Sequence, residues 1–138
     1  MMHIRLANQD DVKALYGLAK DFATSFEVNE STFPHVLERV LADPNAYLAV
    51  AEDADIIGYV LGFDHYTFFA NGRVAWVEEI TVRADQRRSG IGWRLMQAFE
   101  AWAQAREARL VALATRRAAS FYQAIGYEES ATYFRKLL

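Results

Sequence analysis

Residues 73–114 carry the pattern that most constrains the fold. Residues 73–82 alternate between apolar and polar side chains, which is typical of a strand. After a turn that contains two glycines, residues 91–106 repeat apolar side chains at helical spacing, and residues 110–114 form a short apolar run. The apolar face of this helix carries Leu95, Met96, Phe99 and Trp102. Because a whole helix joins the two strands, we expect them to lie parallel through a right-handed crossover.

The segments before and after residues 73–114 also show the side-chain spacing of strands and helices. Strand-like alternation covers residues 4–6, 47–51, 56–63 and, as an edge strand, 132–138. Helical spacing covers a segment that Asn8 or Asp10 caps and that ends near Phe22, then residues 34–41 and 118–125. Gly58 and Gly62 mark positions of a bulge or a close backbone approach. The order β-α-α-β-β-β-α-β-α-β predicts a single mixed sheet with helices on its faces.

Composition limits what such a chain can do. It has 138 residues, 53% hydrophobic and 24% charged, which predicts a soluble globular protein with one domain over residues 1–138. The formal net charge of -3 argues against nucleic-acid binding, because no global positive field is present to neutralise phosphates. The lack of cysteine removes disulfides, thiolate metal sites and a cysteine nucleophile. No stretch resembles a signal peptide or a membrane span, so we expect a cytoplasmic protein without membrane contact.

The turn between the 73–82 strand and the following helix has the character of an anion site. Free backbone N–H groups and the helix dipole favour negative charge at a helix start. Gly90 and Gly92 allow close approach of a ligand, and Arg87 and Arg88 can pair with phosphate oxygens. The other interpretation is a tight turn with two solvated arginines. The pattern lacks the third glycine of a dinucleotide-binding fingerprint and the Gly-Lys-Ser/Thr of a Walker A loop.

Two motifs resemble those of the GNAT superfamily of N-acetyltransferases. The pattern Arg87-x-x-Gly90-x-Gly92, after a strand that ends at Val82, resembles motif A of that family. Residues 121–127, Phe-Tyr-Gln-Ala-Ile-Gly-Tyr, resemble its second motif, and the match covers roughly residues 47–129. The resemblance implies an α/β (α+β) fold with a mixed, mostly antiparallel sheet of about six to seven strands and about four flanking helices. It also implies a splayed pair of parallel strands that holds the cofactor.

The family resemblance implies acetyl-CoA as the cosubstrate and no metal. The pantetheine arm would pair with the backbone of the 73–82 strand, and the pyrophosphate would lie on the amides of the glycine turn. The implied cofactor contacts are Ile80, Thr81, Val82, Arg87, Arg88, Ser89, Gly90, Ile91, Gly92, Trp93 and Phe121. The chain departs from the family where many members carry Asn, because Thr115-Arg116-Arg117 stands there. These two arginines either reach the ribose phosphate of the cofactor or are solvated.

Proton transfer needs a base for the ammonium of the acceptor and an acid for the leaving thiolate. Glu78 and Glu79 are the candidate bases, and strand alternation places them on opposite faces. Glu78 shares parity with Ile80 and Val82, and the resemblance implies a base four or six positions before Val82, which favours Glu78. A bulge would invert this parity, and both residues could be surface carboxylates. The resemblance assigns the acid role to Tyr122. Without cysteine, the direct attack of the amine on the thioester in a ternary complex is the economical mechanism.

The acceptor is the least constrained part of the function. Phe22, Phe26 and Tyr66 together with Glu78 would suit a small cationic amine, through cation–π contacts and charge complementarity, although core packing explains the aromatic residues as well. A protein N-terminus or lysine is the alternative acceptor, and a non-catalytic acyl-CoA-binding or sensing module is the alternative of another class. The three histidines lack metal-ligand spacing. The alternating tail 132–138 offers an edge for a homodimer.

Overall fold

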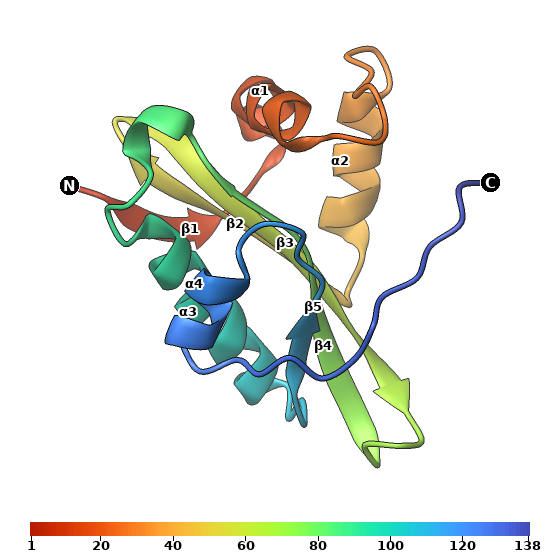
Figure 1. The fold of residues 1–138 in the computed structure, drawn as a ribbon. Coiled ribbons are helices and arrows are strands. Elements are labelled where there is room, and N and C mark those ends of the chain that lie inside the picture. Colours follow the sequence, from red (N-terminus) through yellow and green to blue (C-terminus); the bar gives the residue numbers. More distant parts are fainter.

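The computed structural model describes all residues 1–138 and is built on one five-stranded sheet with the order β1-β2-β3-β4-β5. The strands are β1 (His3–Leu6), β2 (Ala46–Asp53), β3 (Asp55–Thr67), β4 (Gly72–Val82) and β5 (Val111–Leu113). The helices are α1 (Val12–Phe22), α2 (Phe33–Ala42), α3 (Ile91–Ala105) and α4 (Ala119–Ala124), with short 3-10 turns η1 (Gln9–Asp11) and η2 (Ala84–Gln86). Figure 1 shows the sheet between the pair α1 and α2 and the pair α3 and α4. None of the helices is both long and apolar enough to cross a membrane.

The predicted crossover between the two strands is confirmed. Strands β1 to β4 pair antiparallel in sequence order, and β5 pairs parallel to β4 after α3. The parallel ladder is short, because it joins only Ala75, Trp76 and Val77 of β4 to residues 111–113. The sheet is therefore mixed and mostly antiparallel, as expected.

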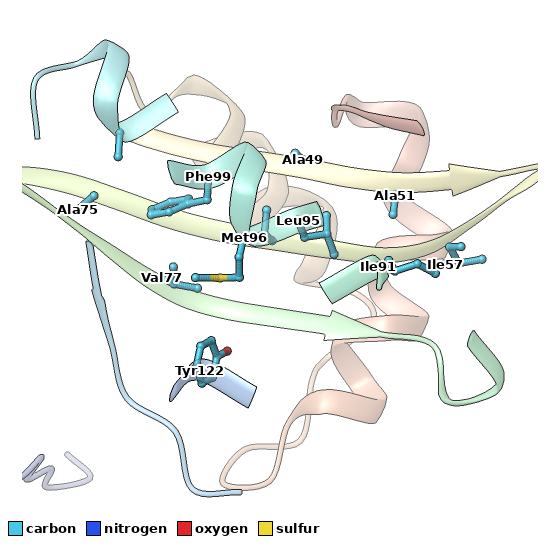
Figure 2. Packing of buried hydrophobic residues seen from close by; sticks show 12 residues of the cluster. Ala49, Ala51, Ile57, Ala75, Val77, Ile91, Leu95, Met96, Phe99 and Tyr122 are labelled. Atoms are coloured by element: carbon cyan, nitrogen blue, oxygen red, sulfur yellow. The ribbon is translucent and has the colours of Figure 1, made fainter. Parts of the chain in front are cut away.

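Each face of the sheet carries its own buried cluster. On one face, α3 and α4 pack on the sheet through a cluster that includes Leu95, Met96, Phe99 and Tyr122, as Figure 2 shows. On the other face, α1 and α2 cover a second cluster centred on Leu15, Leu37, Val50 and Tyr59. Burial of apolar side chains on both faces fixes the register of the central strands, because a slip of one residue would exchange the two faces.

The expectations for local signals are confirmed at several positions. Asn8 caps the first helical turn, where its side chain accepts a hydrogen bond from the Asp10 amide at 2.9 Å. A Cβ on Gly62 would lie 2.2 Å from the Phe99 ring and 2.6 Å from the carbonyl oxygen of Trp76. At Gly58, a Cβ would lie 2.9 Å from the carbonyl oxygen of Thr81. Both glycines are therefore positions of close backbone approach.

The expected number of strands was wrong, because the sheet has five strands and not six to seven. The tail 132–138, expected to be an edge strand, pairs with no strand and is exposed throughout. Tyr133 stacks on Trp76 with ring centroids 6.3 Å apart, and Arg135 donates a hydrogen bond to the Ser25 hydroxyl at 2.7 Å. These contacts direct the tail across the sheet edge towards the α1–α2 loop, away from the line of β5, as Figure 1 shows. Alternation is a local property, whereas a strand also needs a backbone partner.

Candidate active site

The two parallel strands separate at one point, and the predicted site residues lie around it. The pairing of β4 with β5 ends at Val77 and Leu113, whereas β4 continues as a strand to Val82. From Glu78 to Val82, the strand is therefore paired with β3 on one side and has no strand on the other. An edge of this kind presents backbone donors and acceptors to an extended ligand.

A bulge in β4 begins at this point of separation. Gly62 of β3 pairs with Val77 and Leu61 pairs with Glu79, so Glu78 is the extra residue without a cross-strand partner. Such a bulge reverses the alternation of side chains along the strand. Val77 lies in the cluster beneath α3, and beyond the bulge Ile80 packs against that same cluster. The odd-numbered residues after the bulge therefore face α1 and α2.

The bulge gives the two glutamates different surroundings. Glu78 is exposed and its carboxylate makes no hydrogen bond or ion pair with another side chain. Glu79 is half-buried on the α1–α2 face, where its Oε1 accepts a hydrogen bond from the Tyr59 hydroxyl at 2.7 Å. Burial, and secondly the charge of Glu79, raise the pKa of Tyr59, so this phenol remains a donor at neutral pH. The bulge interrupts the alternation on which the parity argument for Glu78 depended, so the faces of the two carboxylates do not follow from parity; the contact with Tyr59 places Glu79 on the α1–α2 face.

Tyr122 projects from α4 into the cluster beneath β4. Its side chain is almost fully buried, and Figure 2 shows its ring beside Val77 of β4. Burial raises the pKa of the Tyr122 phenol, which therefore carries its proton at neutral pH. The hydroxyl makes no hydrogen bond within the chain, yet no buried side-chain oxygen lacks a partner, so this oxygen still reaches the surface. The Tyr122 hydroxyl is therefore free to bond to a molecule that reaches it from the surface.

The loop that precedes α3 presents backbone amides. Arg88 and Gly90 have positive φ angles of 67° and 82°, and no side chain caps the first turn of the helix. Arg87 donates a hydrogen bond from Nε to the carbonyl oxygen of Val82 at 3.0 Å, and the Ser89 hydroxyl donates to the carbonyl oxygen of Gln86 at 2.5 Å. These side chains brace the loop, while the N–H groups of the first helical turn remain free for an anion.

The expected cofactor residues lie together around the carboxyl end of β4. The glycine loop follows that end directly, and a Cβ on Gly92 would lie 3.5 Å from the Phe121 ring. Trp93 is half-exposed in the first turn of α3. Arg116 and Arg117 are exposed and form no ion pair or side-chain hydrogen bond, so both interpretations of these residues stay open.

The expected acceptor residues are not brought together in the same way. Tyr66 lies near the opposite end of the β3–β4 hairpin, where its ring lies 4.5 Å from the guanidinium carbon of Arg73. Arg73 is five residues from Glu78, so roughly 16 Å of strand separates the two positions. Phe22 ends α1 and Phe26 is exposed in the following loop.

Sequence reasoning missed a cavity beside Glu79. The cavity has a volume of about 80 Å³, lies between α1, α2 and the sheet, and is lined by nine hydrophobic residues together with Glu79. Tyr59 and Leu61 of β3 form its floor with Leu48 of β2. The alternation of the 56–63 strand places Tyr59 and Leu61 on one face, and this signal could have linked them to Glu79. No cluster of three or more His, Cys, Asp or Glu residues could hold a metal ion.

Comparisons with known proteins are consistent with this geometry. The structure is similar to a protein described as a transcriptional regulator from Bacillus halodurans C-125, with a TM-score of 0.91 and 20% identity over 100% of both chains. It is also similar to glucosamine-6-phosphate N-acetyltransferase from Arabidopsis thaliana, with a TM-score of 0.89 and 16% identity over 99% of this chain and 98% of that one.

A third similar structure was solved in complex with a bisubstrate analogue. AAC(6')-Iy, solved with the bisubstrate analogue CoA-S-monomethyl-acetylneamine, has a TM-score of 0.82 and 22% identity over 100% of this chain and 99% of that one. At these identities, the likeness to solved structures shows the fold alone. A search of curated protein sequences found no significant match.

The sequence itself carries the family assignment. Residues 12–127 match the family model for the acetyltransferase (GNAT) family, and this range contains the strand separation, the glycine loop and the Phe121-Tyr122 motif. The chain belongs to the acetyltransferase (GNAT) family.

Proposed function

We propose that this protein is an acetyl-CoA-dependent N-acetyltransferase that acts on a primary amine, with a small cationic amine as acceptor. The observation that carries the proposal is the unpaired edge of β4 from Glu78 to Val82, which runs directly into the uncapped start of α3. One end of this site offers backbone partners for an extended chain, and the other offers amides for an anion. A pantetheine arm joined to a pyrophosphate has the same order of groups.

The residues of the site fit acetyl-CoA. The backbone of Ile80, Thr81 and Val82 would hold the pantetheine arm, and the amides from Arg88 to Trp93 would hold the pyrophosphate. Gly90 has open space around it, so no Cβ stands between these amides and a phosphate group. Phe121 lies beside this first helical turn, where it would contact the cofactor. When bound, acetyl-CoA supplies an acetyl group activated as a thioester.

Two side chains supply the proton transfers in this proposal. The exposed Glu78 carboxylate, which has no protein partner, removes a proton from the acceptor ammonium, and the neutral amine then attacks the thioester carbonyl directly. As the C–S bond breaks, Tyr122 donates its proton to the departing sulfur, and the phenolate takes back the second proton of the acylated nitrogen, which leaves a neutral amide and free coenzyme A. The raised pKa of Tyr122 supports this role, because the phenol remains protonated at the pH at which the amine reacts. Glu79 is the second carboxylate of the site and the alternative base.

The acceptor, the catalytic role and the assembly each have a further candidate. A protein N-terminus or lysine is the second candidate acceptor, since both also present a primary amine. A non-catalytic acyl-CoA-binding module is the candidate of another class, and it would need neither Glu78 nor Tyr122. A homodimer is supported by the open edge of β5 and the exposed tail beside it.

Matched substitutions test the proton assignments. Glu78→Gln and Tyr122→Phe should each lower kcat for acetyl transfer by roughly 100-fold or more, the usual effect of a general acid or base. Coenzyme A affinity, measured by titration calorimetry, should remain within about twofold, since neither side chain is assigned to hold the cofactor. Glu38→Gln, an exposed change on α2, is the control and should leave both quantities unchanged.

The acceptor panel separates the proposal from its alternatives. Release of coenzyme A is measured with small amines, with peptides that carry a free N-terminus and with lysine peptides. Release with peptides only would favour the macromolecular acceptor. If the protein binds acetyl-CoA but releases no coenzyme A with any of the three acceptor classes, the binding module is favoured. Full activity of Glu78→Gln and Tyr122→Phe would refute the proton assignments.

A further inference from the structure

We propose that the cavity between α1, α2 and the sheet receives the apolar substituent of the acceptor, while Glu79 binds its ammonium group. The acceptor class is then a primary amine with a single positive charge and a compact alkyl substituent. This inference rests on the proposed acetyl transfer and specifies the acceptor that the sequence leaves open.

The position of the cavity connects it to the transfer site. Glu79 lines the cavity and directly follows Glu78, the bulged residue at which β4 separates from β5. Glu79 points to the α1–α2 face, whereas the cluster beneath α3 occupies the opposite face. An amine that Glu79 binds near the point where β4 separates from β5 can therefore extend its substituent into the cavity under α2 without crossing the sheet.

The charge of Glu79 has no compensation from another residue. Its carboxylate takes part in no ion pair, and its one hydrogen-bond partner is the neutral hydroxyl of Tyr59 at 2.7 Å. By contrast, the buried Asp64 is paired with both Arg73 and Arg106. A half-buried carboxylate against apolar walls favours a cation that reaches it, because burial weakens the competing hydration. The ammonium of the acceptor supplies that cation.

The apolar walls of the cavity determine which substituent the amine can carry. Apart from Glu79, every lining residue is hydrophobic, including Ala19 of α1, Val36 and Val40 of α2, and Leu61 of β3. A second ammonium or a set of hydroxyl groups placed there would lose hydration without gaining partners. A polyamine or an amino sugar is therefore a poor occupant, whereas an alkyl chain gains from leaving water.

The volume limits the size of the substituent. The cavity of about 80 Å³ is roughly half of the ~150 Å³ that admits benzene in a dry protein cavity. A short or branched alkyl chain fits this space, and a fused aromatic ring system does not. The half-exposed Val36 marks the side on which the cavity meets solvent.

A matched amine panel tests the acceptor class. Release of coenzyme A is measured for n-butylamine, isoamylamine, 1,4-diaminobutane and glucosamine at one pH. We expect kcat/KM for the two alkylamines to exceed that for the diamine and the amino sugar by at least roughly tenfold, about 1.4 kcal/mol. A higher kcat/KM for 1,4-diaminobutane or glucosamine would overturn the inference while leaving the proposed acetyl transfer intact.

A pair of variants on one helix tests the cavity directly. Val36→Asp places a carboxylate at a position that lines the cavity, whereas Leu41→Asp makes the same kind of change outside it; the two residues are 53% and 38% exposed. For isoamylamine, Val36→Asp should raise KM at least roughly fivefold with little change in kcat, and Leu41→Asp should change neither. Circular dichroism and thermal melting show that both variants are folded. Equal KM values for the two variants would overturn the inference.

Glu79→Gln separates the ammonium anchor from the proposed base. We expect this variant to raise KM for isoamylamine while kcat falls much less than in Glu78→Gln. Titration calorimetry of isoamylamine into the protein saturated with coenzyme A gives a readout without turnover. Binding that Val36→Asp weakens and Leu41→Asp does not would support the cavity even if no amine were acetylated, and no detectable binding would overturn it.

Discussion

At the scale of single residues, Glu78 and Glu79 show how one backbone irregularity gives two neighbouring carboxylates different chemistry. Glu78 is exposed without a partner, whereas Glu79 is half-buried and bonded to Tyr59. The alternation of the sequence predicted that they occupy opposite faces. It did not predict the bulge at Glu78, because a bulge depends on how β4 aligns with β3 and with the glycine at position 62. The sequence therefore predicted the two carboxylates as candidate bases, but it did not predict the burial or the hydrogen-bond partner of either one.

Gly62 provides a stability prediction at this scale. Gly62→Ala should destabilise the protein by about 3 kcal/mol, the upper part of the usual cost of overpacking. The new methyl group would meet the Phe99 ring, which is fully buried, and the carbonyl oxygen of Trp76, which the sheet holds in place. Urea denaturation measures the free energy of unfolding.

A second glycine serves as the control for this measurement. Gly17 lies inside α1 and a Cβ there would have no atom within 4 Å. Gly17→Ala should therefore stabilise the protein by about 0.5–1 kcal/mol, the usual helical preference for alanine over glycine. If Gly62→Ala were as stable as the original chain, the close approach of β3 to α3 would not exist in solution.

At the scale of elements, the unit from β4 through the glycine loop to α3 was predicted well. Its signals are local: alternation, two glycines and a long amphipathic helix follow one another without interruption. The residues proposed to hold the cofactor were predicted from these signals, and they lie around the carboxyl end of β4. The tail was predicted poorly for the opposite reason, because its alternation carries no information about a partner, and the contacts of Tyr133 and Arg135 led it elsewhere. The cavity beside Glu79 draws on five elements and had no single local signal.

Gly90 at the end of the loop and Gly92 in the first turn of α3 have different roles, and each role leads to a prediction. Gly90 has a φ of 82° and caps α3, so Gly90→Ala should lower the free energy of unfolding by about 1–2 kcal/mol. Gly92 has no such strain, and a Cβ there would make an ordinary contact with Phe121 at 3.5 Å. Gly92→Ala should therefore keep its stability but weaken coenzyme A binding roughly tenfold, about 1.4 kcal/mol, by hindering approach to the helix start. Thermal melts and titration calorimetry measure the two effects.

The opposite pattern would contradict the assignment of this loop. If Gly92→Ala bound coenzyme A as tightly as the original chain, the first turn of α3 would not contact the pyrophosphate. Arg109→Gln is a control, because Arg109 lies before β5 at the other end of the strand pair.

At the scale of the whole molecule, the strand pair is closed at one end and open at the other. At the closed end, the Arg109 amide bonds to the carbonyl oxygen of Arg73 at 2.8 Å, and the Ala75 amide bonds to the carbonyl oxygen of Leu110 at 3.0 Å. Nearby, the buried Asp64 carboxylate is held by Arg106 and Arg73, which ties the end of α3 to β3 and β4. At the open end, β4 continues alone into the glycine loop. Neither side-chain alternation nor composition predicted that Asp64, Arg73 and Arg106 form an ion-pair cluster. Nor did they predict that this cluster lies only at the closed end of the β4–β5 pair.

The open sheet edge and the tail together give the last prediction, which concerns the assembly. β5 is a three-residue edge strand, and the tail that crosses this sheet edge exposes Tyr133, Phe134, Leu137 and Leu138. Unpaired edges and exposed apolar side chains both favour association.

We expect the full chain to sediment as a homodimer and a chain that ends at Glu129 to sediment as a monomer. The shortened chain should keep its far-UV circular dichroism and most of its thermal stability, because the tail adds one ring stack and one hydrogen bond to the fold. A full chain that remained monomeric at all concentrations would show that the tail covers its own edge and serves no second copy.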